Sequence, residues 1–175
     1  MKSFVFALFL FSSTVSACTS WPNNTDTQFN WWQCATGGMS FFNVTPYDAS
    51  AKKYEYPIHL GHPLLLETEA YMPEKYDRPN LKLTVSVFTW NTNSCAWSSL
   101  PTFGLLKEMN ACDNGISCPV PAGSHSFNIE LDFSKHETII NMLKDDSPYQ
   151  LQFVFDNART KNIGCLLTQA RARIH

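Results

Sequence analysis

The stretch from Ala111 to Gly123 reads ACDNGISCPVPAG and decides the fold prediction. Five residues separate Cys112 from Cys118, and the Asp-Asn-Gly run between the two cysteines is typical of a sharp backbone turn. Two prolines stiffen the chain where it leaves the second cysteine. The stretch therefore predicts a small covalent loop that leads directly into a strand.

Strands with one buried face are predicted by apolar residues that alternate with polar ones. One segment with this pattern lies just after the cysteine loop, and four other segments of the chain show the same pattern. Its apolar positions include Phe127, Ile129, Leu131 and Phe133, Leu64 and Leu66, Leu83, Val85 and Val87, Leu151, Phe153 and Phe155, and Ala170 and Ala172. Turn-forming residues separate these segments, and the sequence contains no internal repeat. We therefore expect an all-β fold, an antiparallel two-sheet β-sandwich.

A single short helix is expected between two of the strands. Ser134 and Glu137 have the spacing of a helix capping box, and apolar residues follow at helical intervals. These features predict a helix from about Lys135 to Leu143.

The N-terminal residues 1–17 have the layout of a secretory signal peptide, with an early lysine, a short apolar run and small residues at the end. An uncleaved anchor is the alternative. Residues 18–175 are then one domain, which contains all six cysteines. An even number of cysteines in a secreted chain indicates disulfides and an oxidising compartment.

The charge and the motifs exclude several classes of function. The chain has 13 basic and 15 acidic residues and no basic cluster, so nucleic acid is not an expected partner. Ser134 lies too close in sequence to His136 to form a catalytic triad, and no phosphate loop, nucleophile elbow or zinc-protease motif is present. His59 and His62 lack a third ligand at a useful spacing, so neither a metal nor a cofactor is predicted.

Two N-glycosylation motifs begin at Asn23 and Asn43. A sugar on Asn43 requires this residue to face water, and alternation would then place Phe42 and Val44 in the interior. Both asparagines are therefore candidate glycosylation sites.

The CDNGISCPV run, the lone Cys165 near the end, and the segments FFNVTP (41–46) and IHLGHPLLLETEA (58–70) resemble the ML lipid-recognition domain family. That family includes the Niemann-Pick type sterol carrier, the ganglioside activator and a group of dust-mite allergens. The resemblance extends over about residues 33–174. Its most specific part is the cysteine loop. Many members carry a second short disulfide after the NVTP-like segment, whereas this chain has Tyr47 directly after Pro46.

The resemblance implies an immunoglobulin-like β-sandwich whose sheets separate to hold a lipid. It also implies the disulfides Cys112–Cys118 and Cys34–Cys165, which by elimination leaves Cys18 to pair with Cys95. The implied lipid-binding wall consists of the inward-facing strand residues named above, from Leu64 and Leu66 to Ala170 and Ala172. The same residues would fill an ordinary core if the sheets stayed closed.

We therefore expect a secreted, monomeric lipid-binding or lipid-transfer protein that is not an enzyme. Its ligand would be a sterol, a fatty acid or a phospholipid, and residence in a lysosomal or endosomal lumen is compatible with the sequence. The alternative is a secreted recognition or co-receptor protein of innate immunity, with a filled core and loops that bind a receptor. Candidate residues for an aromatic surface that meets a membrane or a lipid entrance are Trp31, Trp32, Trp90, Trp97 and Phe103.

Overall fold

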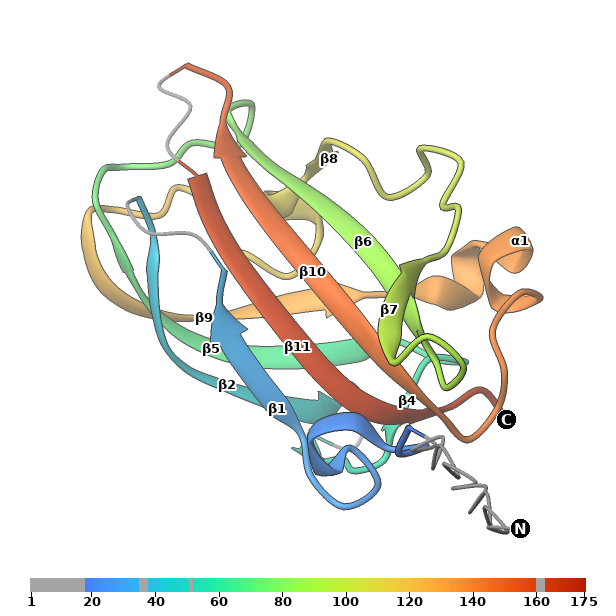
Figure 1. Cartoon of the computed structure of the whole chain (residues 1–175). Coiled ribbons are helices and arrows are strands. Elements are labelled where there is room, and N and C mark those ends of the chain that lie inside the picture. Colours follow the sequence, from blue (N-terminus) through green and yellow to red (C-terminus); the bar gives the residue numbers. More distant parts are fainter. Residues whose placement is uncertain (1–17, 35–37, 51, 160–162) are drawn as a thin grey trace, which may run out of the picture.

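Two β-sheets face each other in the structure, a computed structural model that describes residues 18–34, 38–50, 52–159 and 163–175 (Figure 1). The strands are β1 (Asn30–Gln33), β2 (Ser40–Asp48), β3 (Lys53–Tyr54), β4 (Ile58–His59), β5 (Leu64–Met72), β6 (Leu81–Asn91), β7 (Ala96–Ser99), β8 (Met109–Asn110), β9 (Gly123–Leu131), β10 (Ser147–Asn157) and β11 (Ile163–Arg173). The helical turns are η1 (Pro22–Asn24), η2 (Ala111–Asp113), η3 (Phe133–Lys135) and α1 (Glu137–Ile140). The predicted signal peptide lies outside the described residues.

The larger sheet has the strand order β1-β11-β10-β6-β7, and the smaller sheet has the order β3-β2-β5-β9. The strands along these two paths pair antiparallel, while β4 pairs parallel with the end of β11 and β8 pairs antiparallel with β6. The all-β, two-sheet sandwich predicted from the sequence is confirmed.

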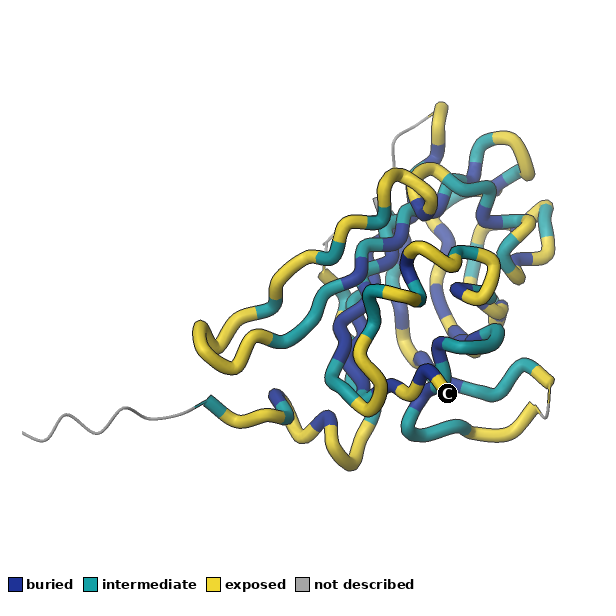
Figure 2. Tube along the Cα trace, turned by 90° about the vertical axis from the view of Figure 1, so that its right-hand side faces the viewer, coloured by how far each residue is buried: buried dark blue, intermediate teal, exposed yellow. Residues whose placement is uncertain are grey.

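The apolar residues of the alternating segments form one core between the sheets. In β5, every second residue from Leu64 to Met72 is buried. Residues of β6 and β10 face each other in register, so that Phe153 lies opposite Val85. Figure 2 shows the buried segments, in dark blue, running along the paired strands inside the molecule.

The cysteine loop docks back onto the strand that follows it. The amide of Glu130 in β9 donates to the carbonyl oxygen of Asn114 over 2.9 Å. A Cβ on Gly115 would lie 2.8 Å from the carbonyl oxygen of Asn128, so this close approach requires glycine. On the other side, Val120 exchanges two backbone hydrogen bonds with the fully buried Tyr76. The loop is therefore fixed both to β9 and to the segment before β6.

The three disulfides pair Cys18 with Cys95, Cys34 with Cys165, and Cys112 with Cys118. These are the pairings expected from the resemblance and from elimination. The Cys34–Cys165 bridge joins the end of β1 to β11, where the amide of Cys34 also donates to the carbonyl of Cys165. Disulfides indicate an oxidising compartment.

The prediction that Phe42 faces the interior is wrong. The register of β2 against β5 shifts between Phe41 and Asn43, which is a β-bulge. The extra residue reverses the alternation, so Phe41 is buried and Phe42 is 57% exposed. Val44 is buried as expected, and Asn43 is exposed.

The predicted helix from about Lys135 to Leu143 forms only in part. Asp132 accepts hydrogen bonds from the backbone and the hydroxyl of Ser134, so it caps the 3-10 turn η3, which includes Ser134. His136 then leaves helical geometry, and α1 covers four residues without a side-chain cap. The capping-box assignment of Ser134 and Glu137 is therefore wrong. Asp132 is the N-cap of η3, and Ser134 lies inside that turn and does not cap α1.

In the part of the chain that the structure describes, no helix combines the length and the apolar character that are needed to cross a membrane.

Candidate functional site

The residues predicted to form the lipid-binding wall lie together in the core between the sheets. Each of them is at most 9% exposed. They are Leu64, Leu66, Leu83, Val85, Val87, Phe127, Ile129, Leu131, Phe133, Leu151, Phe153, Phe155, Ala170 and Ala172. Phe133 belongs to η3 rather than to a strand and closes one end of the same core.

The interior between the sheets is filled by these side chains. A side chain that borders a space large enough for water has some accessible surface, yet Leu83, Val87, Ile129, Phe153 and Phe155 have none. Native cores are packed in this way, with few voids of molecular size. Contact between these residues and a lipid requires the sheets to separate, so their role as a lipid-binding wall stays a prediction.

A hollow opens at one end of the sandwich, and we call it the end pocket. Its volume is about 380 Å³. Its apolar walls come from Trp21, Trp90, Leu100, Met142 and Tyr149, and its polar residues are Ser20, Thr89, Thr92, Lys144, Asp146 and Ser147, with Pro148 between them. A second hollow, of about 370 Å³, lies over the Cys112–Cys118 loop and is lined by Arg78 but by no aromatic residue. The end pocket is therefore the better candidate for an apolar ligand.

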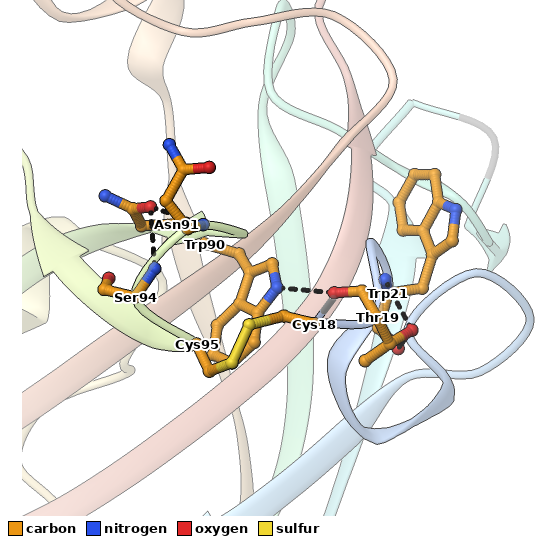
Figure 3. Close-up of a disulfide and its surroundings, with 8 residues drawn as sticks. Cys18, Thr19, Trp21, Trp90, Asn91, Ser94 and Cys95 are labelled. Carbon is orange, nitrogen blue, oxygen red and sulfur yellow. Dashed lines mark hydrogen bonds between the residues drawn. A yellow bond between two sulfur atoms is a disulfide. The ribbon is translucent and has the colours of Figure 1, made fainter. Parts of the chain in front are cut away.

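The N-terminal segment forms one wall of the end pocket, and a disulfide holds it in place (Figure 3). Cys18 is bonded to Cys95 in the turn between β6 and β7. Nearby, the indole nitrogen of Trp90 donates to the carbonyl oxygen of Thr19 over 2.8 Å. The Trp90 ring also meets Trp97 edge to face at 5.3 Å between centroids. Trp90 is therefore anchored on two sides.

The floor of the end pocket continues into the core. Tyr149 is buried among the core residues and also lines the pocket. The backbone amide of Leu100 donates to the carbonyl of Val87, which holds Leu100 beside the edge of β6, and the Leu100 side chain packs against the core. The pocket is thus separated from the space between the sheets by side chains of the core itself.

Tyr149 also fixes the loop that borders the pocket. Its hydroxyl oxygen accepts from the amide of Lys144 over 2.6 Å and donates to the Lys144 carbonyl over 3.0 Å. Burial raises the pKa of Tyr149 above its ordinary value, while the hydrogen bond from the Lys144 amide opposes this rise. The hydroxyl is therefore neutral at physiological pH and acts as a structural latch.

Two carboxylates hold the same loop at the rim. Asp146 accepts from two nitrogens of Arg171 over 2.6 and 2.7 Å, and Asp145 accepts from the amide of Ile174 over 2.7 Å. These hydrogen bonds lower the pKa of both carboxyls below the ordinary range. The Arg171 guanidinium also lies 5.2 Å above the ring of Trp21. The rim is thus polar and charged, while the walls are apolar.

Sequence reasoning found only part of this pocket. Trp90 was among the aromatic candidates, and Tyr149 continues the alternating series of β10. No local pattern marks Trp21, Leu100 or Met142, because they become neighbours only in the folded chain. Trp21 belongs to the N-terminal segment held by the Cys18–Cys95 disulfide, which we call the strap, Leu100 directly follows β7, and Met142 follows α1. Of the other aromatic candidates, Trp31 packs on the core, while Trp32 and the 67% exposed Phe103 face solvent.

The remaining predicted site residues are dispersed. The side-chain amide of Asn23 donates to Gln169 over 2.7 Å, so a sugar on this nitrogen would displace a hydrogen bond of the folded chain. Asn43 faces solvent and has room for a sugar. His62 lies beside Asp48 and Glu55, two carboxylates that precede the histidine pair in the sequence and that the fold brings next to it.

No protein-family model matches the sequence, and no curated protein matches it. Among solved structures, a Niemann-Pick type C2 protein from Japanese carpenter ant matches at a TM-score of 0.50 and 15% identity, over 82% of this chain and 99% of that chain. The C-terminal domain of wzt matches at a TM-score of 0.44 and 10% identity, over 83% and 78%. The first likeness confirms the resemblance at the level of architecture: the chain has the fold of a Niemann-Pick type C2 protein, an ML-domain β-sandwich.

Proposed function

We propose that this protein is a secreted lipid-binding protein that takes a sterol or an acyl chain into the end pocket. The observation that carries the proposal is the apolar wall of that pocket, which continues through Tyr149 and Leu100 onto the core of an ML-type sandwich. The pocket volume lies within the range of small-molecule sites in proteins. Binding would be physical, without a chemical step.

The proposed binding mode places the apolar part of the ligand against Trp21, Trp90 and Met142 and its polar end at the rim. Lys144 and the Asp146–Arg171 pair offer both signs of charge there. Burial of about ten methylene groups gives about 8 kcal/mol, enough for micromolar affinity before the costs of association. A longer ligand would enter the core by moving Tyr149 and the loop that it latches.

The test uses two fluorescent probes, cis-parinaric acid and dehydroergosterol, added to delipidated protein. Trp21 and Trp90 line the pocket, so bound probe should quench tryptophan emission by energy transfer and saturate at one probe per chain. Met142→Asp places a charge in the pocket wall and should weaken binding at least tenfold. Leu105→Asp is the matched control, because Leu105 is exposed outside the pocket.

Failure of both probes to bind the folded wild type would overturn the proposal. Equal binding by the Met142→Asp and Leu105→Asp variants would place the ligand elsewhere and would overturn the assignment to the end pocket. Lipid extraction from protein purified without detergent would then identify whether any apolar molecule accompanies the chain.

The filled interior favours a second candidate, a recognition protein that binds its partner through loops. The segment after β7 carries exposed Phe103 and Leu105 next to the buried Leu106, so its tip is apolar while its base is fixed in the core. This candidate predicts that no lipid copurifies and that a charge at Phe103 abolishes partner binding while a charge at Met142 does not. The two candidates therefore differ in which of these residues matters.

A further inference from the structure

A cluster of metal-ligating side chains lies at the edge of the sandwich, and none of its members lines the end pocket. Asp48 ends β2, Glu55 follows β3, and His62 follows β4. Each offers one ligand atom, and these atoms lie within 4.8 Å of one another. All three residues are half-buried.

Two buried polar atoms, one in this cluster and one beside it, have no hydrogen-bond partner among the described residues. They are Oε2 of Glu55 and Nδ1 of His59. His59 stacks on His62, with ring centroids 4.5 Å apart and planes 9° apart. Buried polar atoms are nearly always satisfied, so an exception points to a ligand, an ion or a water molecule. Here two exceptions occur beside the same candidate ligands.

The fold holds the backbone in place at Asp48 and next to His62. Asp48 lies opposite Lys53 in the β2–β3 hairpin, and its Oδ1 accepts from the backbone and the hydroxyl of Ser50 over 2.7 and 2.6 Å. Next to His62, a Cβ on Gly61 would lie 2.0 Å from the carbonyl oxygen of Ile174, so this approach to the chain end requires glycine. The Asp48 side chain and the chain next to His62 are therefore fixed without an ion.

A simple ion pair accounts for only part of this arrangement. Nε2 of His62 lies 3.8 Å from Oε1 of Glu55, too far for a hydrogen bond. Two carboxylates close together repel each other, and one imidazole can offset only one of them when it is protonated. A divalent cation would attract all three ligand atoms and neutralise both carboxylates.

We propose that Asp48, Glu55 and His62 form a binding site for a transition-metal dication, with Zn²⁺ as the best fit. One imidazole nitrogen with two carboxylate oxygens suits Zn²⁺, whereas Ca²⁺ and Mg²⁺ prefer oxygen ligands alone. Partial exposure leaves a fourth position for water. Asp48 and Glu55 flank the edge hairpin of the smaller sheet, and His62 follows β4, which pairs with β11 of the larger sheet. His62 also lies two residues before Leu64, which pairs with Asp48 in the smaller sheet, so the ion ties the edge hairpin to the loop between β4 and β5.

The experiment titrates ZnCl₂ into chelator-treated, tag-free mature protein by calorimetry and follows the melting temperature in parallel. Wild type should bind one Zn²⁺ with micromolar affinity and melt at a higher temperature in its presence. Glu55→Gln and His62→Gln should each weaken binding at least tenfold. Glu69→Gln is the matched control, because Glu69 is exposed on β5 outside the cluster, and it should bind like wild type.

Asp48→Asn provides a second carboxylate variant, in case Glu55→Gln unfolds the hairpin, and circular dichroism checks each fold. Absence of saturable Zn²⁺ binding by wild type would overturn the proposal. Equal affinity in Asp48→Asn, His62→Gln and wild type would also overturn it. None of these outcomes depends on lipid, so the result is independent of the proposed function.

Discussion

The interior and the end pocket of the sandwich differ in how fully their residues are buried. Between the sheets, residues such as Phe153 and Phe155 are fully buried among the other core residues. At the end pocket, Trp21 and Met142 keep an accessible face around a space of about 380 Å³. The comparison teaches that the strands enclose the packed core, while the accessible hollow lies where strands end and the N-terminal segment covers them.

The largest effect is expected from Phe153→Ala. Phe153 lies in the middle of β10, between Val85 and Leu166 on the neighbouring strands. Removal of its ring from a packed core should lower the free energy of unfolding by about 3 to 5 kcal/mol, measured by urea denaturation. Binding of a probe in the end pocket by the remaining folded protein should change little.

Phe42→Ala is the control for this variant, because Phe42 is a phenylalanine that the β-bulge exposes. Its cost should stay below about 0.5 kcal/mol. A loss for Phe153→Ala as small as that of Phe42→Ala would mean that the interior is loosely packed in solution. The distinction between a solid interior and an open end would then fail.

The second effect concerns the strap. Replacement of Cys18 and Cys95 by serine removes a bridge across 77 residues and should cost about 2 to 4 kcal/mol. The N-terminal wall of the pocket should then detach, so probe affinity should also fall at least tenfold. The matched control is the Cys34→Ser, Cys165→Ser variant, whose bridge lies away from the pocket. It should lose stability but keep probe affinity, and the opposite pattern would contradict a strapped pocket.

The third effect tests the boundary between the two regions. Tyr149→Phe keeps the buried ring and removes the hydroxyl that both accepts from and donates to Lys144. The expected cost is about 1 kcal/mol, because two hydrogen bonds are lost while water can reach the loop. Hydrogen exchange of the Lys144 amide should quicken by about tenfold, whereas amides of the paired β10 strand should stay protected. Unchanged exchange at Lys144 would show that the hydroxyl is not the latch.

The predictability of the two regions from sequence follows the same division. Strands with one buried face, such as β5 and β6, repeat every two residues, so the sequence alone locates their inner positions. The pattern failed at Phe42 because one inserted residue shifts the register. The capping-box prediction failed at Ser134 because Asp132, two residues earlier, caps the turn that contains Ser134.

The end pocket was largely invisible in the sequence because its residues become neighbours only in three dimensions. Trp21 reaches the pocket through the Cys18–Cys95 strap, and Met142 reaches it through the segment after α1. The same reason hid the Asp48, Glu55 and His62 cluster, whose members lie at or after the ends of three different strands. Only Cys112 and Cys118 combined a local pattern with a specific structure, which explains why that loop indicated the fold.

The smallest effect is expected from acid at the rim of the pocket. The hydrogen bond from Arg171 lowers the pKa of Asp146 below 3.8, and the bond from the Ile174 amide does the same for Asp145. Since the folded pKa is the lower one, this stabilisation is complete above the ordinary value and is lost as the pH falls below it. The protection factors of amides 144–147, which correct for the change of intrinsic exchange with pH, should therefore fall as the pH drops below that ordinary value, before those of the β10 core. Asp146→Asn should show fast exchange already at neutral pH, while Glu137→Gln, an exposed change in α1, should follow wild type.

An acidic organelle, at about pH 5 to 6, lies above this transition. Release of a ligand there would have to begin at groups other than these two carboxylates, and an Asp146→Asn variant that retains the wild-type pH profile would contradict the rim latch itself.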